Sequence, residues 1–145
     1  MPDDRQVCTF RLDGHTFGID VLRVQEIIRH QETTRVPLAP DAVRGLINLR
    51  GQIVTAIDLR RRLNLPERSG GTQPVNVVVQ TDDGAVSLLV DEIGDVATVT
   101  DVAFEPPPNT LRGPAREMIR GAYKLDGRLL LLLDSEKVLS PVGGV

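Results

Sequence analysis

A recurring spacing between glycine and aspartate is the feature that most constrains the fold of this chain. In three places an apolar run follows a turn glycine and ends seven residues later at an aspartate: Gly51 to Asp58, Gly84 to Asp91 and Gly127 to Asp134. Gly14 to Asp20 repeats the pattern one residue shorter. A second apolar run precedes each glycine, and two such runs around a tight turn are typical of an antiparallel β-hairpin.

The repeat has two explanations that the residues leave open. Any β protein made of hairpins recurs in this way, or the chain duplicates one unit, a short barrel whose strand leads into a capped helical turn. Two of the copies continue alike, as DLRRRLNLP from Asp58 and as DSEKVLSP from Asp134. The leucine run at residues 129–133 lacks polar alternation, which predicts a strand buried on both faces. The predicted fold class is therefore all-β with short helices, with barrels packed against each other.

Capping signals and periodicity predict the remaining elements. Asp20, Asp58 and Asp134 are expected to cap short helices that end at residues 22, 65 and 139, because an aspartate accepts hydrogen bonds from free N–H groups at a helix start. Residues 24–28 fit a helix or an irregular strand equally well. Strands are expected at residues 7–12, 17–20, 45–49, 53–57, 75–81, 85–90, 93–99, 119–125 and 128–133.

Proline and glycine mark the expected loops and ends. Residues 33–40 and 105–108 hold several prolines and are expected to be extended. The segment 66–74, PERSGGTQP, is interpreted as a mobile surface loop, and residues 141–145 as a C-terminal tail. The whole chain, residues 1–145, is expected to form one domain made of two subdomains.

Composition excludes several classes of function. The net charge is −3, with 17 basic against 20 acidic residues, so no basic field would hold nucleic acid. Only 3% of residues are aromatic, so the core is expected to consist of Val, Leu and Ile. Cys8 is the single cysteine, which excludes an internal disulfide and favours a buried, unreactive role. No apolar run approaches the length needed to cross a bilayer, and a cytoplasmic protein without membrane insertion is expected.

No catalytic motif is present, so the chain is predicted not to be an enzyme. The motifs GxSxG, HExxH, CxxC, GxxxxGK and GxGxxG after a strand are all missing. His15 and His30 lie near no cluster of metal-ligand type and are interpreted as structural or surface residues, so no metal or cofactor is expected. An enzyme that uses two unpaired carboxylates in a barrel cleft is the alternative from another class.

Three groups of polar residues are candidates for recognition. Arg50, with Gly51 and Gln52, is expected to form the turn between two strands, where it either stabilises the turn or binds a partner. The pair Gln25 and Glu26 lies between apolar residues and is either an exposed ridge or part of a site. The arginines at 60–62 are interpreted as a solvated helix face.

Several fragments together resemble the CheW-like coupling proteins of bacterial chemotaxis. The fragments are FGID at residues 17–20, VLRVQEI at 21–27, RGLINLRG at 44–51, IDL at 57–59, LLVD at 88–91 and IRG at 119–121. Each fragment alone is weak, but their order and spacing are specific and cover nearly the whole chain. The resemblance implies two intertwined, five-stranded SH3-like β-barrel subdomains.

The resemblance also implies a function without catalysis. Members of this family link the cytoplasmic tip of chemoreceptors, a helical hairpin, to the regulatory domain of the chemotaxis histidine kinase. The groove between the barrels, near Arg50 and Val24, is expected to take the receptor tip, and the barrel ends are expected to take the kinase. An adaptor for a related pathway that controls pili or development is the alternative. The partner-binding positions implied by the resemblance are Val24, Glu26, Gly45, Arg50, Val75, Val96 and Gly121.

Two residues depart from the family pattern. Ser87 stands where glycine is expected, and Thr55 where proline is common. Serine has a side chain, so a close approach of another backbone at this point is less expected than with glycine. Threonine in place of proline changes only the rigidity of the strand.

Overall fold

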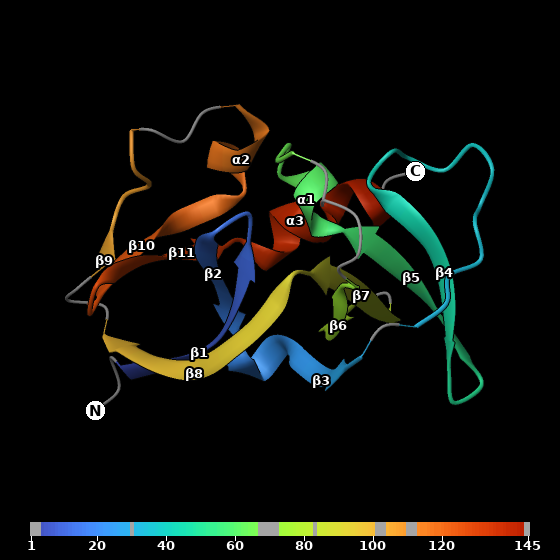
Figure 1. Cartoon of the computed structure of the whole chain (residues 1–145), viewed down its shortest axis with the longest axis horizontal. Helices are drawn as coiled ribbons and strands as arrows, with labels where there is room; N and C mark the ends of the chain where they lie inside the picture. The colour runs from blue at the N-terminus through green and yellow to red at the C-terminus, as the bar shows by residue number, and fades with distance from the viewer. Residues whose placement is uncertain are drawn as a thin grey trace.

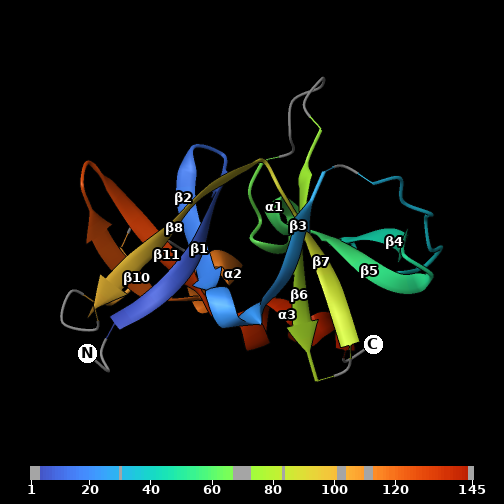
Figure 2. The same cartoon turned by 90° about the horizontal axis from the view of Figure 1, so that it is seen from below.

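The protein contains two β-sheets. Each sheet includes two antiparallel hairpins, and a parallel pairing of one strand from each hairpin joins them side by side. The computed structural model describes residues 4–29, 31–66, 73–82, 84–100, 104–109 and 113–143. The six-stranded sheet has the order β8-β1-β2-β11-β10-β9 and the five-stranded sheet the order β3-β6-β7-β5-β4. The sheets lie beside each other and both curve strongly (Figures 1 and 2). The prediction of a mainly β chain with two barrel-like subdomains is confirmed, although one sheet has six strands rather than the expected five.

The strands are β1 (Asp4–Leu12), β2 (His15–Asp20), β3 (Val24–Ile28), β4 (Val43–Leu49), β5 (Gln52–Asp58), β6 (Val75–Thr81), β7 (Gly84–Val90), β8 (Glu92–Thr100), β9 (Phe104–Glu105), β10 (Ile119–Leu125) and β11 (Arg128–Leu133). The helices are η1 (Val21–Arg23), α1 (Leu59–Arg62), α2 (Pro114–Glu117) and α3 (Ser135–Gly143).

The two sheets repeat one arrangement, as the glycine-to-aspartate spacing suggested. In the six-stranded sheet the hairpin β1–β2 is joined to the hairpin β10–β11 by parallel pairing of β2 with β11. In the five-stranded sheet the hairpin β6–β7 is joined to β4–β5 by parallel pairing of β7 with β5. The chain also crosses between the sheets, because β3 follows β2 but pairs with β6, and β8 follows β7 but pairs with β1. The subdomains are therefore intertwined.

The expected turns form with backbone angles that favour glycine. Asp13 and Gly14 have φ values of 51° and 79°, and Arg50 and Gly51 have values of 54° and 85°. Two successive residues with positive φ suit a two-residue hairpin turn. The prediction of a three-residue apex was wrong by one residue, because Gln52 already belongs to β5.

The predicted caps are confirmed at all three aspartates. Asp20 accepts a hydrogen bond from the Leu22 N–H at 2.9 Å, and Asp58 accepts one from the Arg60 N–H at 3.1 Å. Asp134 accepts one from the Lys137 N–H at 3.2 Å. The question left open for residues 24–28 is answered, since they form strand β3.

The last helix is longer than the sequence suggested. It was expected to end at Leu139, but α3 runs through Pro141 to Gly143. Pro141 has no N–H to donate to the Lys137 carbonyl four residues earlier. Arg62 replaces that donor, because its Nη2 donates to the Lys137 carbonyl at 2.9 Å and its Nε to the Val138 carbonyl at 2.9 Å. The expected tail at 141–145 therefore begins inside a helix, and residues 144–145 lie outside the described residues, as does most of the loop expected at 66–74.

The interpretation of the arginines at 60–62 as a solvated face was wrong. The Arg60 side chain is only 12% exposed, and its guanidinium binds the Asp91 carboxylate through Nε at 2.9 Å and Nη2 at 2.5 Å. The hydrogen bond to Asp91 raises the pKa of Arg60 above its ordinary value, against the opposing effect of burial. Asp13 lies 3.9 Å from Arg60, and its backbone N–H donates to Asp91 at 3.0 Å. One arginine of α1 thus connects the β1–β2 turn to the end of β7.

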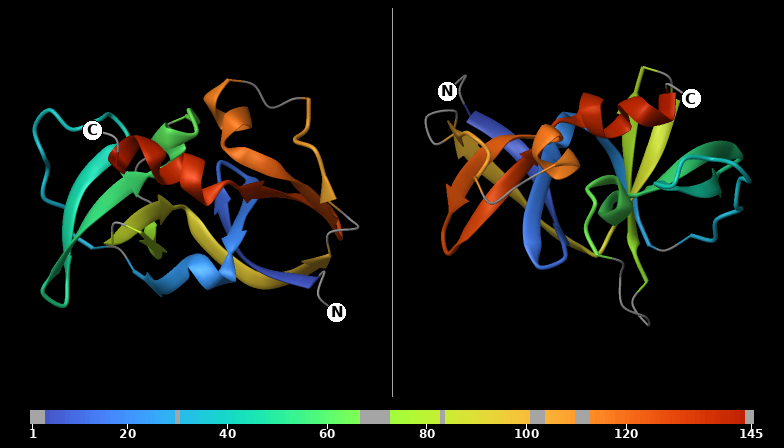
Figure 3. Two further views of the ribbon diagram at one scale, coloured as in Figure 1. Left: turned by 180° about the vertical axis from the view of Figure 1, so that it is seen from behind. Right: turned by 90° about the horizontal axis from the view of Figure 1, so that it is seen from above.

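The main hydrophobic core includes side chains from both sheets. Phe10 and Ile19 of the six-stranded sheet belong to the same buried cluster as Ile57 and Leu88 of the five-stranded sheet. Val138 of α3 joins this cluster, and α3 runs from the end of β11 toward the five-stranded sheet (Figure 3). The sheets therefore share one core.

Strand β11 is buried on both faces, as its leucine run predicted. Leu131 and Leu133 belong to the shared core, whereas Leu130 and Leu132 belong to a second cluster with Tyr123.

Substitution of Asp91 by alanine tests the link between the sheets. We expect Asp91→Ala to lower the free energy of unfolding by about 3 kcal/mol, because it leaves the largely buried Arg60 cation without its main partner. Chemical denaturation measures this change. The control is Asp126→Ala in an exposed turn, which should change stability by less than about 0.5 kcal/mol. Equal, small effects of both substitutions would show that the network does not stabilise the fold.

Candidate partner-binding site

Glu26 and Arg50 form a bidentate ion pair. Arg50 Nη1 lies 2.9 Å from Glu26 Oε2, and Arg50 Nη2 lies 2.9 Å from Glu26 Oε1. Glu26 belongs to β3 and Arg50 follows β4, and these strands are the opposite edges of the five-stranded sheet. The sheet therefore curves until its edges meet at this pair, as in a barrel.

Local backbone geometry positions both side chains. At the β4–β5 turn, positive φ at Arg50 places it at the apex, and the Gly51 N–H donates to the Asn48 side-chain oxygen at 2.8 Å. Strand β3 has a register shift between Val24 and Glu26, which a β-bulge produces. Burial alternates along β3, so Glu26 is partly buried while Gln25 and Ile27 on either side of it are exposed.

The pair holds an exposed cation in a defined orientation. The Arg50 side chain is 80% exposed and the Glu26 side chain 20% exposed. Exposed ion pairs contribute only about 0–1 kcal/mol to stability. Bidentate geometry, however, restricts the rotamers of a long side chain, and such preorganisation lowers the entropy lost when a partner binds. The arrangement suits recognition better than stabilisation.

Exposed isoleucines occur on the strands that carry or follow the pair. Ile27 of β3 is 42% exposed and Ile53 of β5 is 60% exposed. Sequence reasoning did not identify either as a surface residue. The period of residues 24–28 was ambiguous, and alternation along β5 puts Ile53 on the same face as the buried Ile57. Exposed large apolar side chains such as these are available for contact with a partner.

The three predicted valines do not form one patch. Val24 and Val75 are half-buried and pack against the shared core. Val96 is 53% exposed but lies on β8 of the six-stranded sheet, opposite Cys8. The structure thus places Val24 on the strand of Glu26 and separates Val96 from the ion pair.

Both predicted glycines are buried where backbones approach closely. A side chain at Gly45 would collide with the Thr34 carbonyl oxygen. A side chain at Gly121 would collide with the Phe104 ring and lie 2.5 Å from the Glu105 carbonyl oxygen. The geometry gives these two residues a role in packing of the strands.

The departure at Ser87 is accommodated by a buried partner. Ser87 and Asn76 are both fully buried, and the Ser87 hydroxyl donates to the Asn76 side-chain oxygen at 2.8 Å. The Asn76 amide donates in turn to the Arg29 carbonyl at 3.1 Å. Paired polar groups of this kind avoid the cost of burying an unsatisfied donor.

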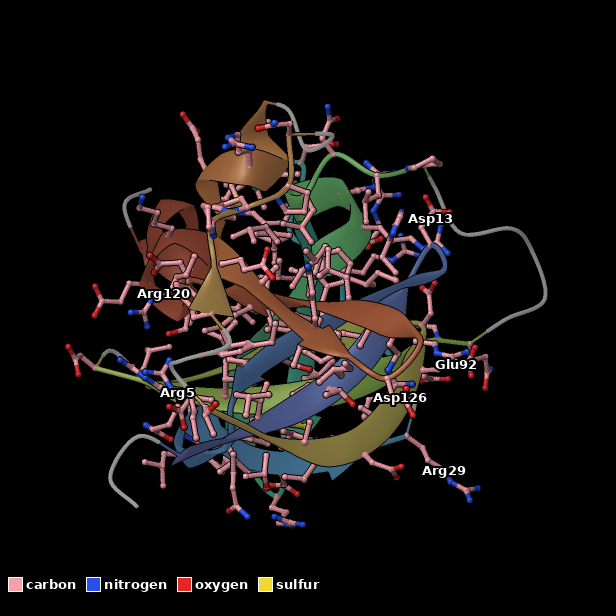
Figure 4. The ribbon with its side chains drawn as sticks, turned by 90° about the vertical axis from the view of Figure 1, so that its left-hand side faces the viewer. Arg5, Asp13, Arg29, Glu92, Arg120 and Asp126 are labelled. Carbon is pink, nitrogen blue, oxygen red and sulfur yellow. The ribbon has the colours of Figure 1, made fainter. Side chains whose placement is uncertain are left out.

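The cysteine and the charged side chains bear on the other classes of function considered for this chain. Across its described ranges there is no group of three or more His, Cys, Asp and Glu side chains that could hold a metal ion. Burial raises the pKa of the Cys8 thiol, which disfavours the reactive thiolate. Basic and acidic side chains such as Arg5, Arg120, Glu92 and Asp126 are interspersed around the six-stranded sheet (Figure 4).

None of the helices in the described ranges is long and apolar enough to span a membrane.

Two intertwined β-barrels that share one hydrophobic core define the structural class of this chain. The CheW-like domain family matches residues 6–142, and the chain belongs to this family. It is 37% identical over 131 residues to the chemotaxis protein CheW of Klebsiella aerogenes, covering 90% of this chain and 79% of that protein. It is 34% identical to CheW of Bacillus subtilis, covering 92% and 86%.

A solved structure supports the same conclusion. The crystal structure of the scaffolding protein CheW from Thermoanaerobacter tengcongensis matches with a TM-score of 0.80 at 26% identity, covering 90% of this chain and 88% of that one. Both the fold class and the adaptor class that the resemblance implied are confirmed.

Substitutions at the predicted positions should separate packing from recognition. We expect Gly45→Ala and Gly121→Ala to lower the free energy of unfolding by about 1–3 kcal/mol, because the new methyl group overpacks the backbone contact. Arg50→Ala should lower it by less than about 1 kcal/mol. Urea denaturation of the three variants measures the difference. A loss at Arg50 as large as that at the glycines would show that the ion pair mainly holds the barrel closed.

Proposed function

We propose that this protein couples chemoreceptors to the regulatory domain of a chemotaxis histidine kinase and has no enzymatic activity of its own. The observation that carries the proposal is the exposed Arg50, held by Glu26 at the meeting point of two sheet edges, in a chain of the CheW-like family. The relatives named above are chemotaxis proteins, and none favours a pathway for pili or development.

The proposed mechanism is binding geometry. The groove between the barrels takes the receptor tip. Arg50 was expected near this groove, but it lies with Ile53 at the β4–β5 turn, and we assign this turn to the kinase domain instead. Val96 is exposed on β8 of the six-stranded sheet, on the other barrel from Ile53. Two separate surfaces allow one chain to hold two partners at once.

Modest affinity at each surface suits this role. Transient signalling interfaces often bury less than about 1,200 Å² in total, and micromolar dissociation constants are usual for them. Repetition of the same contacts in an array raises the effective strength through high local concentration. In this proposal the protein is cytoplasmic, and its partners recruit it to membrane-bound receptor arrays.

Binding assays with the purified partners test the proposal. The chain should bind the cognate kinase regulatory domain and the cognate receptor tip in isothermal titration calorimetry. Binding of neither partner would contradict the proposed function.

Variants of the ion pair test the role of Arg50. We expect Arg50→Ala and Glu26→Ala to weaken binding of one partner about tenfold or more, because each removes a preorganised charge from the interface. The charge-swapped double variant Glu26→Arg/Arg50→Glu is the control, since it restores the pair with the charges reversed. Binding recovered by the swap would assign the pair a purely structural role, whereas binding that stays weak identifies Arg50 as the recognised group.

A further inference from the structure

The segment between β3 and β4 forms an arch that is fixed at both feet. At its start, Thr34 and Leu46 exchange two backbone hydrogen bonds of 2.8 Å. At its end, the Asp58 N–H donates to the Ala42 carbonyl at 2.8 Å. We call residues 34–42 the arch, and Figure 1 shows it at the outer side of the five-stranded sheet. Because both feet are bonded to the sheet, the arch is held in place rather than merely tethered.

A fully exposed leucine occupies the crest of the arch in an unfavourable backbone conformation. The Leu38 side chain has a relative exposure of 103%, and its φ is 68°. The Ala39 N–H donates to the Val36 carbonyl at 3.3 Å, so Pro37 and Leu38 are the central residues of a turn. Glycine or asparagine is normal at a turn position with positive φ. Leucine there has neither a favoured backbone nor a buried side chain, so nothing within the fold accounts for it.

Arginines surround the hollow beneath the arch. The hollow has a volume of about 760 Å³, and Arg35, Arg44 and Arg61 line it, against Asp41 as the single carboxylate. Asp41 is paired with Arg61 at 2.8 Å. Arg44 is half-exposed and 3.5 Å from Asp58, and the exposed Arg35 has no ion-pair partner within the described ranges. The arch is therefore locally basic on a chain whose net charge is −3.

We propose that the arch is a docking site for an acidic surface of the kinase regulatory domain that carries an apolar socket. Leu38 and Val36 fill the socket, and Arg35 and Arg44 pair with carboxylates at its rim. This inference rests on the proposed function, which assigns the groove between the barrels to the receptor tip. Figure 1 shows the arch on the outer side of the five-stranded sheet, away from the six-stranded sheet, so we assign it to the kinase domain rather than to the partner in the groove.

The arch gives Gly45 a positioning role. Gly45 lies beside Leu46 on β4, and a side chain at this position would collide with the Thr34 carbonyl at the foot of the arch. Replacement would push the foot away from the sheet and move Leu38 with it. Gly45 therefore supports docking through the arch rather than by contact with the partner.

Leu38 offers a test in which binding and stability move in different directions. We expect Leu38→Asn and Leu38→Gly to weaken binding of the kinase regulatory domain at least fivefold, while the melting temperature stays the same or rises, because both residues accept positive φ. The charge reversals Arg35→Glu and Arg44→Glu should weaken the same binding and reduce its dependence on salt. Binding of the receptor tip should not change.

The matched control is Leu22→Asn, because Leu22 is 89% exposed in η1 and lies outside the arch. It should leave kinase binding unchanged. Kinase binding that is unaffected by the Leu38 variants, or weakened equally by Leu22→Asn, overturns the inference and leaves the adaptor function intact. If the Leu38 variants weaken binding of the receptor tip and not of the kinase domain, the inference is also overturned, and the adaptor function again stays intact. Failure of the unmodified chain to bind either partner would overturn the adaptor function and the inference with it.

Discussion

The contact between Arg60 and Asp91 connects the parts of this structure that the chain order separates. Arg60 belongs to α1, which follows the hairpin β4–β5, whereas Asp91 lies between β7 and the crossing strand β8. Asp13, in the turn of the other sheet, donates its backbone N–H to the same carboxylate. Around this network the two sheets share one hydrophobic core. The relative position of the barrels therefore depends on one partly buried charge and on the apolar surfaces packed around it.

Much of the fold could be predicted because local signals determine it. The hairpin turns need glycine, the caps need a short carboxylate, and a strand buried on both faces needs leucines without alternation, as at 130–133. Each of these requirements is satisfied by residues within a few positions of one another.

The predictions that were wrong concerned residues whose contacts lie far away in the sequence. Arg60 and Arg62 look solvated in a run of three arginines, but their partners lie 31 and 76 residues away. The same applies to Pro141, which stays in a helix because Arg62 of another element replaces the missing donor. At the candidate site, resemblance identified Glu26 and Arg50, but only the curvature of the sheet shows that they meet. Leu38 was not identified, since its significance lies in its φ and exposure rather than in its neighbours in sequence.

The crossing of β3 and β8 between the sheets has a consequence for how such an adaptor transmits a signal. Strand β3 follows β2 of the six-stranded sheet but pairs in the five-stranded sheet, and β8 follows β7 of the five-stranded sheet but pairs in the six-stranded one, so removal of either strand would leave both sheets incomplete or disconnected. These pairings are remote in sequence and are expected to form late in folding. Two partners held on different barrels would be joined by a stiff body rather than by a hinge. If one partner rotated, the rigid adaptor would rotate with it and would turn the other partner by a similar amount.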